Sequence, residues 1–324
     1  MGNHESRDEE WVGWIEEAQE RISGIAVETP VALISDEPNR FGPAQVYVKL
    51  ENLQKSGSFK LRGAANKVLS LTADEAARGI VTSSSGNHGL GVATAAQYRG
   101  IDAEVFFSAQ VSSKKHQWLQ KLGARTRQVG DNPLGAELAA RAAAADSGRT
   151  YISPYNDPFV VAGQGTIALE LTRQVPHVDA VYVAVGGGGL ISGIGSYLNG
   201  VSPQTEVVGC WPENSRVMYE SLKVGRIIEF PEQSTLSEST AGGLEPGSIT
   251  FALCQKVVHR HVLISESEIL DAMRWAQQRE WSVEGAAGVA IAACFKDVFR
   301  NRGTTVAIVC CGGNLSPEVE RQLA

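Results

Sequence analysis

The sequence has no long apolar run and no excess of positive charge. No stretch of its 324 residues reaches the roughly 18 uninterrupted apolar residues of a membrane-spanning helix. The first 14 residues, MGNHESRDEEWVGW, carry many charges and lack the apolar core of a signal peptide. A formal net charge of -7 offers no basic surface to nucleic acid or to an anionic membrane. These absences predict a cytoplasmic protein without a nucleic-acid or membrane partner.

Cysteine is scarce and irregularly spaced. The sequence has five cysteines, an odd number, and no CxxC pair: Cys210, Cys254, Cys294, Cys310 and Cys311. This pattern supplies neither a disulfide framework nor a zinc site. We therefore expect buried free thiols and no metal ion.

Short apolar runs flanked by glycine alternate with helix-like segments. The apolar runs are AQVYVKL, GIVTSS, AEVFF, DAVYVAV and TEVVGCW, and the helix-like segments include RGAANKVLSL, HGLGVATAAQYRG and LISGIGSYLNG. Because parallel strands need helical crossovers, this alternation indicates an α/β fold. We expect a large domain formed by residues 1–72 and 159–324. A smaller domain, residues 82–158, would be inserted within it, with a cleft between the two.

Four consecutive glycines follow a strand expected over residues 180–185 and precede a helix: Gly186, Gly187, Gly188 and Gly189. Without side chains this glycine loop (residues 186–189) can approach an anion closely, and the helix that follows adds its positive N-terminal end. The run fits neither GxGxxG nor GxxxxGK[ST]. A bound monophosphate is favoured over a dinucleotide, although a tight turn without a ligand would use the same residues.

A second loop, TSSSGNHG, also joins a short strand to a helix; we call it the serine loop (residues 82–89). Ser84, Ser85 and Asn87 offer neutral donors, and the helix end adds a positive field, so the loop can bind a carboxylate. Simple helix capping would explain the same residues. His88 by itself is more typical of a structural histidine than of a catalytic base.

The segment VAIVCCGGN, residues 306–314, reads as an apolar strand that ends at a cysteine, two glycines and an asparagine. Parallel strands point their carboxyl ends at the ligand crevice, so Cys311 could face a bound cofactor. A buried inert thiol is the alternative. The segment SGSFKLRGA adds a single amine, Lys60, between a phenylalanine and a leucine.

Together these segments suit a ligand with a phosphate at one end and a carbonyl that a lysine can reach, as in pyridoxal phosphate. The motifs SGSFKLRGA, SSSGNHG, AGQGTIALEL, VGGGGLISG, VEGAAGVAIAA and CGGN occur in this order. With these motifs in this order, the sequence from about Ile25 to Leu315 resembles the fold type II pyridoxal phosphate enzymes of the threonine/serine dehydratase and serine racemase group. The resemblance implies a fold like that of the tryptophan synthase β chain, with two domains, each a mostly parallel twisted sheet flanked by helices. It also implies a homodimer.

The resemblance assigns roles to individual residues. Lys60 matches the lysine that forms a Schiff base with the cofactor, and a partly apolar setting would lower its pKa and favour the neutral amine. Ser85 matches the second catalytic residue. The expected cofactor contacts are Phe59 near the pyridine ring, Asn87 at the phenolic oxygen, the glycine loop at the phosphate, Leu190, Glu284, and Cys311 at the pyridine nitrogen. The expected substrate contacts are Ser84, Ser85, Gly86, Asn87 and His88.

The neutral thiol of Cys311 would leave the pyridine ring a weak electron sink, which favours elimination. We therefore expect a dehydratase (ammonia-lyase) that converts a β-hydroxy amino acid such as L-threonine or L-serine into a 2-oxo acid and ammonia. One alternative is an amino-acid racemase, in which Ser85 acts on the face opposite Lys60. Another is a dehydratase for phenylserine, 3-hydroxyaspartate or hydroxyectoine utilisation. A further alternative is a non-catalytic sensor that only binds the cofactor or an amino acid. The presence of Lys60 argues against it, because binding alone would not need this lysine.

The sequence departs from the family at several positions. Trp211 and Val217 stand where metal-activated members have acidic ligands, so we expect no divalent metal. Glu213 could bind a cation, but one carboxylate beside Arg216 is more often a solvated pair, which is what we expect here. Gly242 replaces an acidic residue, which hints at a larger or more acidic β-substituent. Because the chain ends shortly after CGGN without a regulatory extension, a catabolic role is expected.

Overall fold

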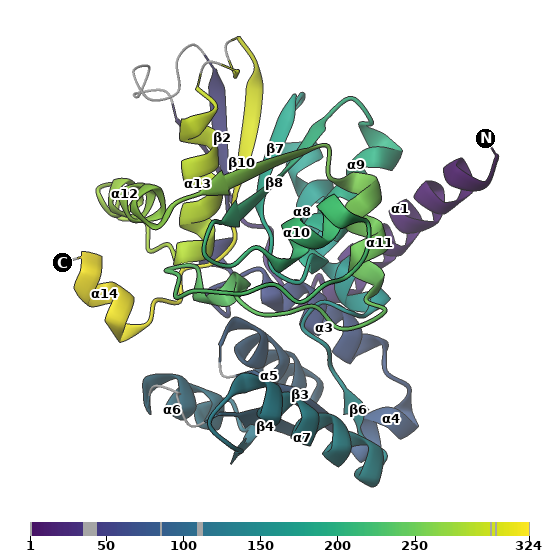
Figure 1. Ribbon diagram of the computed structural model, residues 1–324. Coiled ribbons are helices and arrows are strands. Elements are labelled where there is room, and N and C mark those ends of the chain that lie inside the picture. Colours follow the sequence, from purple (N-terminus) through teal and green to yellow (C-terminus); the bar gives the residue numbers. More distant parts are fainter. Residues whose placement is uncertain are drawn as a thin grey trace.

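The computed structural model describes residues 2–34, 44–84, 86–108, 113–298, 300–301 and 303–323. Within these residues the strands form two separate sheets, one of six strands and one of four. The two sheets lie in different halves of the molecule (Figure 1). The α/β prediction is confirmed.

The larger sheet has the strand order β1-β2-β10-β7-β8-β9. Only β1 runs antiparallel to its neighbour; the other pairs are parallel. Every residue of β7 is buried, as expected for a strand covered on both faces. The strands are β1 (Val31–Ile34), β2 (Gln45–Leu50), β7 (Ala180–Ala184), β8 (Glu206–Pro212), β9 (Arg260–Ile264) and β10 (Thr305–Cys310).

Helices cover both faces of this sheet (Figure 1). One face is covered by α8 (Pro158–Gln174) and α9 (Gly189–Val201), with α1 (Gly2–Ile22) packed against both, and the other by α12 (Glu266–Gln277) and α13 (Gly285–Lys296). Further helical elements that the structure describes outside the smaller sheet's half are η1 (Glu51–Leu53), α3 (Lys60–Ser70), α10 (Val217–Val224), η2 (Glu238–Thr240), α11 (Ile249–Val257) and α14 (Pro317–Leu323).

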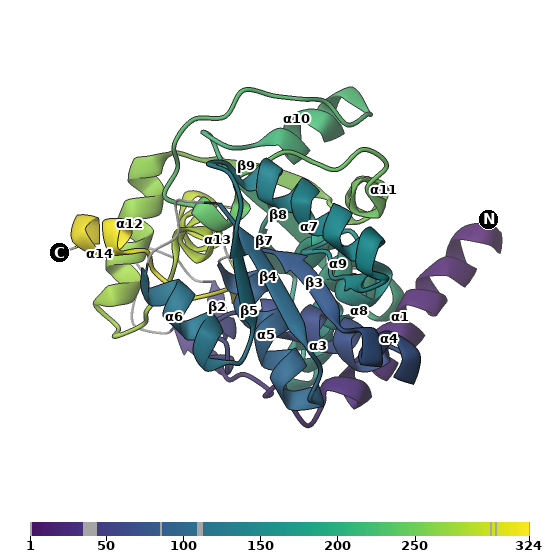
Figure 2. The same cartoon turned by 90° about the horizontal axis from the view of Figure 1, so that it is seen from below.

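The smaller sheet is fully parallel, with the order β5-β4-β3-β6. Its strands are β3 (Ile80–Ser83), β4 (Ala103–Phe107), β5 (Arg125–Gln128) and β6 (Thr150–Tyr151), and its helices are α4 (Ala73–Arg78), α5 (Asn87–Arg99), α6 (Ser113–Lys121) and α7 (Pro133–Ser147). Figure 2 shows this sheet and α7 in front of the larger sheet. The domain limits at residues 82 and 158 stay a prediction, and β3 begins two residues before the first of them.

Helix α3 joins the two halves, because it packs against α5 on one side and α8 on the other. The approach to α8 is close enough to require glycine. A Cβ added at Gly163 would lie 2.6 Å from the carbonyl oxygen of Arg62. The start of α3, which carries Lys60, is thus held against the large half by backbone contact.

A charge-balanced cluster lies buried beside this helix. Arg62 contacts Glu51 at 2.8 Å and Glu170 at 2.6 Å, and Lys49 contacts Glu170 at 2.6 Å. All four side chains are at most 1% exposed. Burial alone disfavours each charge, so the two cations and two anions depend on one another. The cluster links β2 and η1 to α3 and α8.

The described helices include none that is both long and apolar enough to cross a membrane. All five cysteines are buried and free, as the sequence predicts.

Candidate active site

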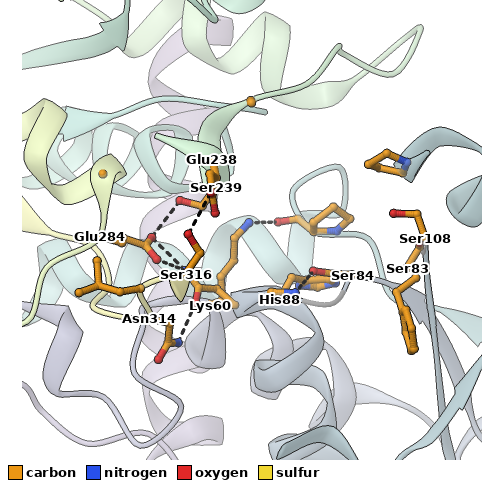
Figure 3. Close-up of a pocket in the computed structure, with 18 of the residues that line it drawn as sticks. Lys60, Ser83, Ser84, His88, Ser108, Glu238, Ser239, Glu284, Asn314 and Ser316 are labelled. Carbon is orange, nitrogen blue, oxygen red and sulfur yellow. Dashed lines mark hydrogen bonds between the residues drawn. The ribbon is translucent and has the colours of Figure 1, made fainter. Parts of the chain in front are cut away.

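A cavity of about 410 Å³ lies between the two halves. The small half contributes the serine loop, the end of β4 and the start of α7, and the large half contributes the start of α3, η2 and the segment after β10. Figure 3 shows the side chains that point into it, with Lys60 near the centre. A smaller cavity of about 40 Å³ shares Lys60, Asn87 and Ser239 with it.

The smaller cavity brings together residues that are far apart in the sequence. Its lining includes the predicted cofactor contacts Phe59, Lys60, Asn87, Gly186, Gly187, Gly188, Gly189, Leu190 and Cys311. Glu284, the remaining predicted contact, lines the larger cavity. The structure therefore places all of these residues at one site. Their individual roles stay predictions.

Lys60 is the first residue of α3. Its Nζ donates a hydrogen bond to the carbonyl oxygen of Pro154 at 2.8 Å and lies 5.2 Å from the centre of the Phe59 ring. Desolvation lowers the pKa of the Lys60 amine to about 8, although the neighbouring Cys311 and Glu284 act in the opposite direction. A substantial fraction of this amine is neutral near physiological pH, as nucleophilic and base chemistry both require.

This pKa predicts how the cofactor-free protein responds to pH. Below about pH 8 the Lys60 amine is mostly protonated, and above it mostly neutral. Coupling of pyridoxal phosphate to this amine should therefore accelerate about tenfold per pH unit up to pH 8 and then level off. Stopped-flow absorbance would measure the rate, with Nα-acetyl-lysine as the reference amine. A midpoint near 10.5, the ordinary lysine value, would contradict the prediction.

The glycine loop forms a cradle that side chains would fill. A Cβ at Gly187 would lie 2.5 Å from the ring of Tyr155, and one at Gly186 would lie 2.8 Å from the carbonyl oxygen of Thr240. Gly188 has a φ of +84°, which favours glycine. Helix α9 begins at Gly189, and first-turn N–H groups have no partner within their own helix. These features fit the phosphate of pyridoxal phosphate.

A hydrogen-bonded chain crosses the site beside Lys60 (Figure 3). Asn314 donates to the side-chain oxygen of Asn87 at 2.7 Å, and the Asn87 amide donates to the two carboxylate oxygens of Glu284 at 2.9 and 2.7 Å. Ser239 also donates to Glu284, at 2.9 Å. The chain fixes the orientation of the Asn87 amide, which is predicted to contact the cofactor.

Cys311 directly follows β10 and is 2% exposed. Burial raises the pKa of its thiol well above the ordinary value, and the charge of Glu284 adds to the effect. The thiol is therefore neutral, as the argument for a weak electron sink assumed. Its backbone carbonyl accepts a hydrogen bond from Phe59 at 3.0 Å, which ties β10 to the segment before Lys60.

The serine loop forms part of the cavity wall that the small half contributes. Ser84, Gly86, Asn87 and His88 line it. His88 has Nε2 3.0 Å from the carbonyl oxygen of Ile152. Burial, and then the charge of Lys60, lower the pKa of His88 to about 3, so the ring is neutral and suits a structural role. Ser85, the predicted second catalytic residue, lies outside the described residues.

Sequence reasoning did not identify several residues that the structure brings to the site. Tyr155, Ser239 and Asn314 belong to this group, and so do Glu137 and Glu238, which line the larger cavity. Asn314 lies inside the CGGN motif and could have been found there. The others come from segments without a recognisable pattern, and only their packing reveals them.

The structure shows where the residues lie that depart from the family pattern. Trp211 is buried and stacks on His261, with the ring centres 5.2 Å apart, and Val217 is buried at the start of α10. Gly242 has a φ of +127°, which favours glycine, and is exposed outside the lining of the larger cavity.

The predicted pair of Glu213 and Arg216 is wrong. The Arg216 guanidinium pairs with the carboxylate of Glu220 at 2.9 Å, one helical turn away, and contacts only the backbone carbonyl of Glu213. Arg216 occupies the N-cap position of α10, and the i,i+4 spacing brings Glu220 within its reach.

Comparisons with known proteins come from both sequence and structure. Residues 22–312 match the model of a family described as "Pyridoxal-phosphate dependent enzyme". The L-threonine ammonia-lyase of Thermotoga maritima is 40% identical over 304 residues, which cover 93% of this chain and 75% of that protein. The serine racemase of Arabidopsis thaliana is 34% identical over 93% of this chain and 92% of that protein. The solved structure of the processed threonine deaminase isoform 2 from Solanum lycopersicum superposes with a TM-score of 0.93 at 28% identity, covering 100% of this chain and 89% of that one.

Proposed function

The chain belongs to the pyridoxal-phosphate dependent enzymes, and from this premise we propose that it is an ammonia-lyase for β-hydroxy amino acids such as L-threonine or L-serine. The observation that carries the proposal is the Lys60 amine. Its pKa is lowered to about 8, and it lies between the glycine loop and the serine loop, at the junction of the two cavities.

The residues around Lys60 would hold the cofactor. The glycine loop and the N-terminus of α9 would bind its phosphate, and Phe59, Asn87 and Cys311 would contact its ring. When bound, pyridoxal phosphate supplies an electron-withdrawing ring system that acidifies the Cα–H bond of the amino acid. Lys60 would carry the cofactor through Nζ.

The remaining steps belong to the chain's own groups. The serine loop would hold the substrate carboxylate through neutral donors and the field of α5. Lys60, once released as a neutral amine, would take the Cα proton at Nζ. The Cβ–O bond would then break and the hydroxyl would leave as water, taking up one proton in place of the one that Lys60 removed from Cα. Later addition of water releases ammonia, so the net change converts the amino acid into a 2-oxo acid and ammonia.

Purified protein loaded with pyridoxal phosphate tests the proposal. We expect at least one of L-threonine, L-serine, phenylserine and the 3-hydroxyaspartate isomers to yield 2-oxo acid and ammonia in equal amounts. A coupled 2-oxo acid assay together with ammonia determination would show it. Failure of the whole panel, with the cofactor reducible onto Lys60, would contradict the proposal.

Racemisation is the second candidate, because the relatives include a serine racemase as well as an ammonia-lyase. Chiral chromatography of the same reactions separates the two activities. Accumulation of D-serine from L-serine in excess of pyruvate would favour a racemase.

We further propose a cytoplasmic homodimer. The free, buried state of all five cysteines suits a reducing compartment, and the dimer rests on the resemblance to the family. Sedimentation velocity would determine the oligomeric state, and a monomer at micromolar concentration would contradict the proposal.

A further inference from the structure

The larger cavity is lined by carboxylates from both halves of the molecule. Glu137 comes from α7 and Glu238 from η2, while Glu284 lies deeper, beside Asn87. Lys60 is the one cation among the described lining residues, because His88, with a pKa of about 3, is neutral. Among the residues that the structure describes, the outer lining of the cavity is therefore negatively charged.

Glu238 carries its charge without a described ionic partner. Its side chain accepts a hydrogen bond from the hydroxyl of Ser316 at 3.1 Å, and Figure 3 shows the two residues on the same side of the cavity as Glu284. No ion pair within the described part of the chain includes Glu238. A hydroxyl donor orients a carboxylate but leaves its full negative charge in place.

Glu137 shares its cation with a second acid. The Arg141 guanidinium lies 2.9 Å from Glu137 and 2.7 Å from Glu245. Two carboxylates around one guanidinium leave one net negative charge. Arg141 itself is not part of the described cavity lining, whereas Glu137 is. The small half therefore also presents a carboxylate without a full compensating charge.

The proposed chemistry fixes which part of the substrate meets these groups. The α-carboxylate is expected at the serine loop and the amine near Lys60, so the β-substituent extends toward the remaining walls, which include Glu137 and Glu238. At a few ångströms like charges repel and opposite charges attract. A carboxylate on the β-carbon would therefore be disfavoured there and an ammonium favoured.

We propose that this cavity selects β-hydroxy amino acids whose β-carbon carries a neutral or cationic group over those that carry a carboxylate, with Glu137 and Glu238 as specificity-determining residues. Assignment of this role to a catalytic site rests on the proposed function. This proposal differs from the expectation based on Gly242, which allowed a more acidic β-substituent on the substrate. Gly242 lies outside the cavity lining, whereas Glu137 and Glu238 are part of it.

Binding of two amino acids without a β-hydroxyl group tests this selectivity apart from turnover. L-2,4-diaminobutyrate and L-aspartate have side chains of similar size and opposite charge. Titration of the holoenzyme, followed by the absorbance of the bound cofactor, gives the two dissociation constants. We expect diaminobutyrate to bind about tenfold more tightly than aspartate, or better.

Neutral isosteric variants identify the residues responsible. Glu238→Gln and Glu137→Gln should each lower the diaminobutyrate-to-aspartate affinity ratio by about three- to tenfold. Glu16→Gln, which removes the same charge from an exposed position on α1, should leave the ratio unchanged. Equal or tighter binding of aspartate by the unaltered protein would overturn the inference. So would a ratio that both active-site variants leave unchanged.

Turnover separates this inference from the proposed function. The kcat/KM ratio of 3-hydroxy-2,4-diaminobutyrate to 3-hydroxyaspartate should follow the affinity ratio in the unaltered protein and in both variants. If no β-hydroxy amino acid is converted, the proposed function fails while the binding experiment still decides the charge selectivity. If threonine is converted but aspartate binds better than diaminobutyrate, only the selectivity fails.

Discussion

Replacement of Lys60 by alanine is expected to lower kcat for 2-oxo acid formation by about a thousandfold or more. The structure gives two reasons. The Lys60 amine is the one cationic group in the described lining of both cavities, and its lowered pKa of about 8 makes it available as a base. No other described side chain there combines a lowered pKa near neutrality with access to the substrate.

Two controls make the Lys60 result specific. Lys55→Ala removes an exposed lysine five residues earlier and should retain full activity. Lys60→Arg keeps a positive charge but cannot become neutral near pH 8, and it should be as inactive as the alanine variant. Circular dichroism would verify folding. Borohydride reduction followed by mass spectrometry should place the cofactor on Lys60 of the unaltered protein. Activity of Lys60→Ala within tenfold of the unaltered protein would exclude the assigned role.

Replacement of Arg62 by leucine is expected to lower the free energy of unfolding by about 3–5 kcal/mol. Arg62 is the shared partner of Glu51 and Glu170, and all three side chains are at most 1% exposed. Their mutual contacts raise the pKa of Arg62 and lower that of Glu51, against the opposing effect of desolvation on both. Without the guanidinium, Lys49 alone would face two buried carboxylates.

A surface pair supplies the matched control for Arg62. Arg125 contacts Asp102 at 2.6 Å, but the two side chains are 53% and 46% exposed, and Arg125→Leu should cost less than about 1 kcal/mol. Urea unfolding followed by circular dichroism would measure both variants. The double variant Arg62→Leu, Glu51→Gln keeps the Lys49–Glu170 pair and should recover part of the loss. Equal effects of Arg62→Leu and Arg125→Leu would contradict the prediction.

The sequence predicts the central parts of the site because each of them is formed by one short segment of the chain. A strand that runs into glycines and then a helix specifies a cradle from backbone geometry alone, and the structure forms it between β7 and α9. The same holds for Asn87 at the start of α5 and for Cys311 after β10. In the larger sheet the carboxyl ends of the parallel strands share one edge, which brings the glycine loop and Cys311 together. Asn87 follows β3 of the smaller sheet and joins them only because the two halves pack together.

Residues that surround the site escaped prediction because no short segment specifies their partners. Glu238 lies on η2 and Glu137 on α7, at the two sides of the cavity. Tyr155 contributes by filling the space that the missing side chain of Gly187 leaves. The partner of Arg216 was wrong for a different reason. Arg216 occupies the N-cap position of α10, four residues before Glu220, and this local i,i+4 spacing was not used in the prediction.

By itself, the sequence determined the α/β fold, the family, the cofactor and the residues expected to hold it, because strand–turn–helix motifs and a lysine in an apolar segment carry their physical meaning locally. Only the tertiary structure decided the charge of the cavity, the chain of hydrogen bonds through Asn87 and Glu284, and the buried cluster at Arg62. These depend on groups between 11 and 227 residues apart. Their distances are set by the packing of α3 between α5 and α8 and by the meeting of the two halves, which no local pattern records.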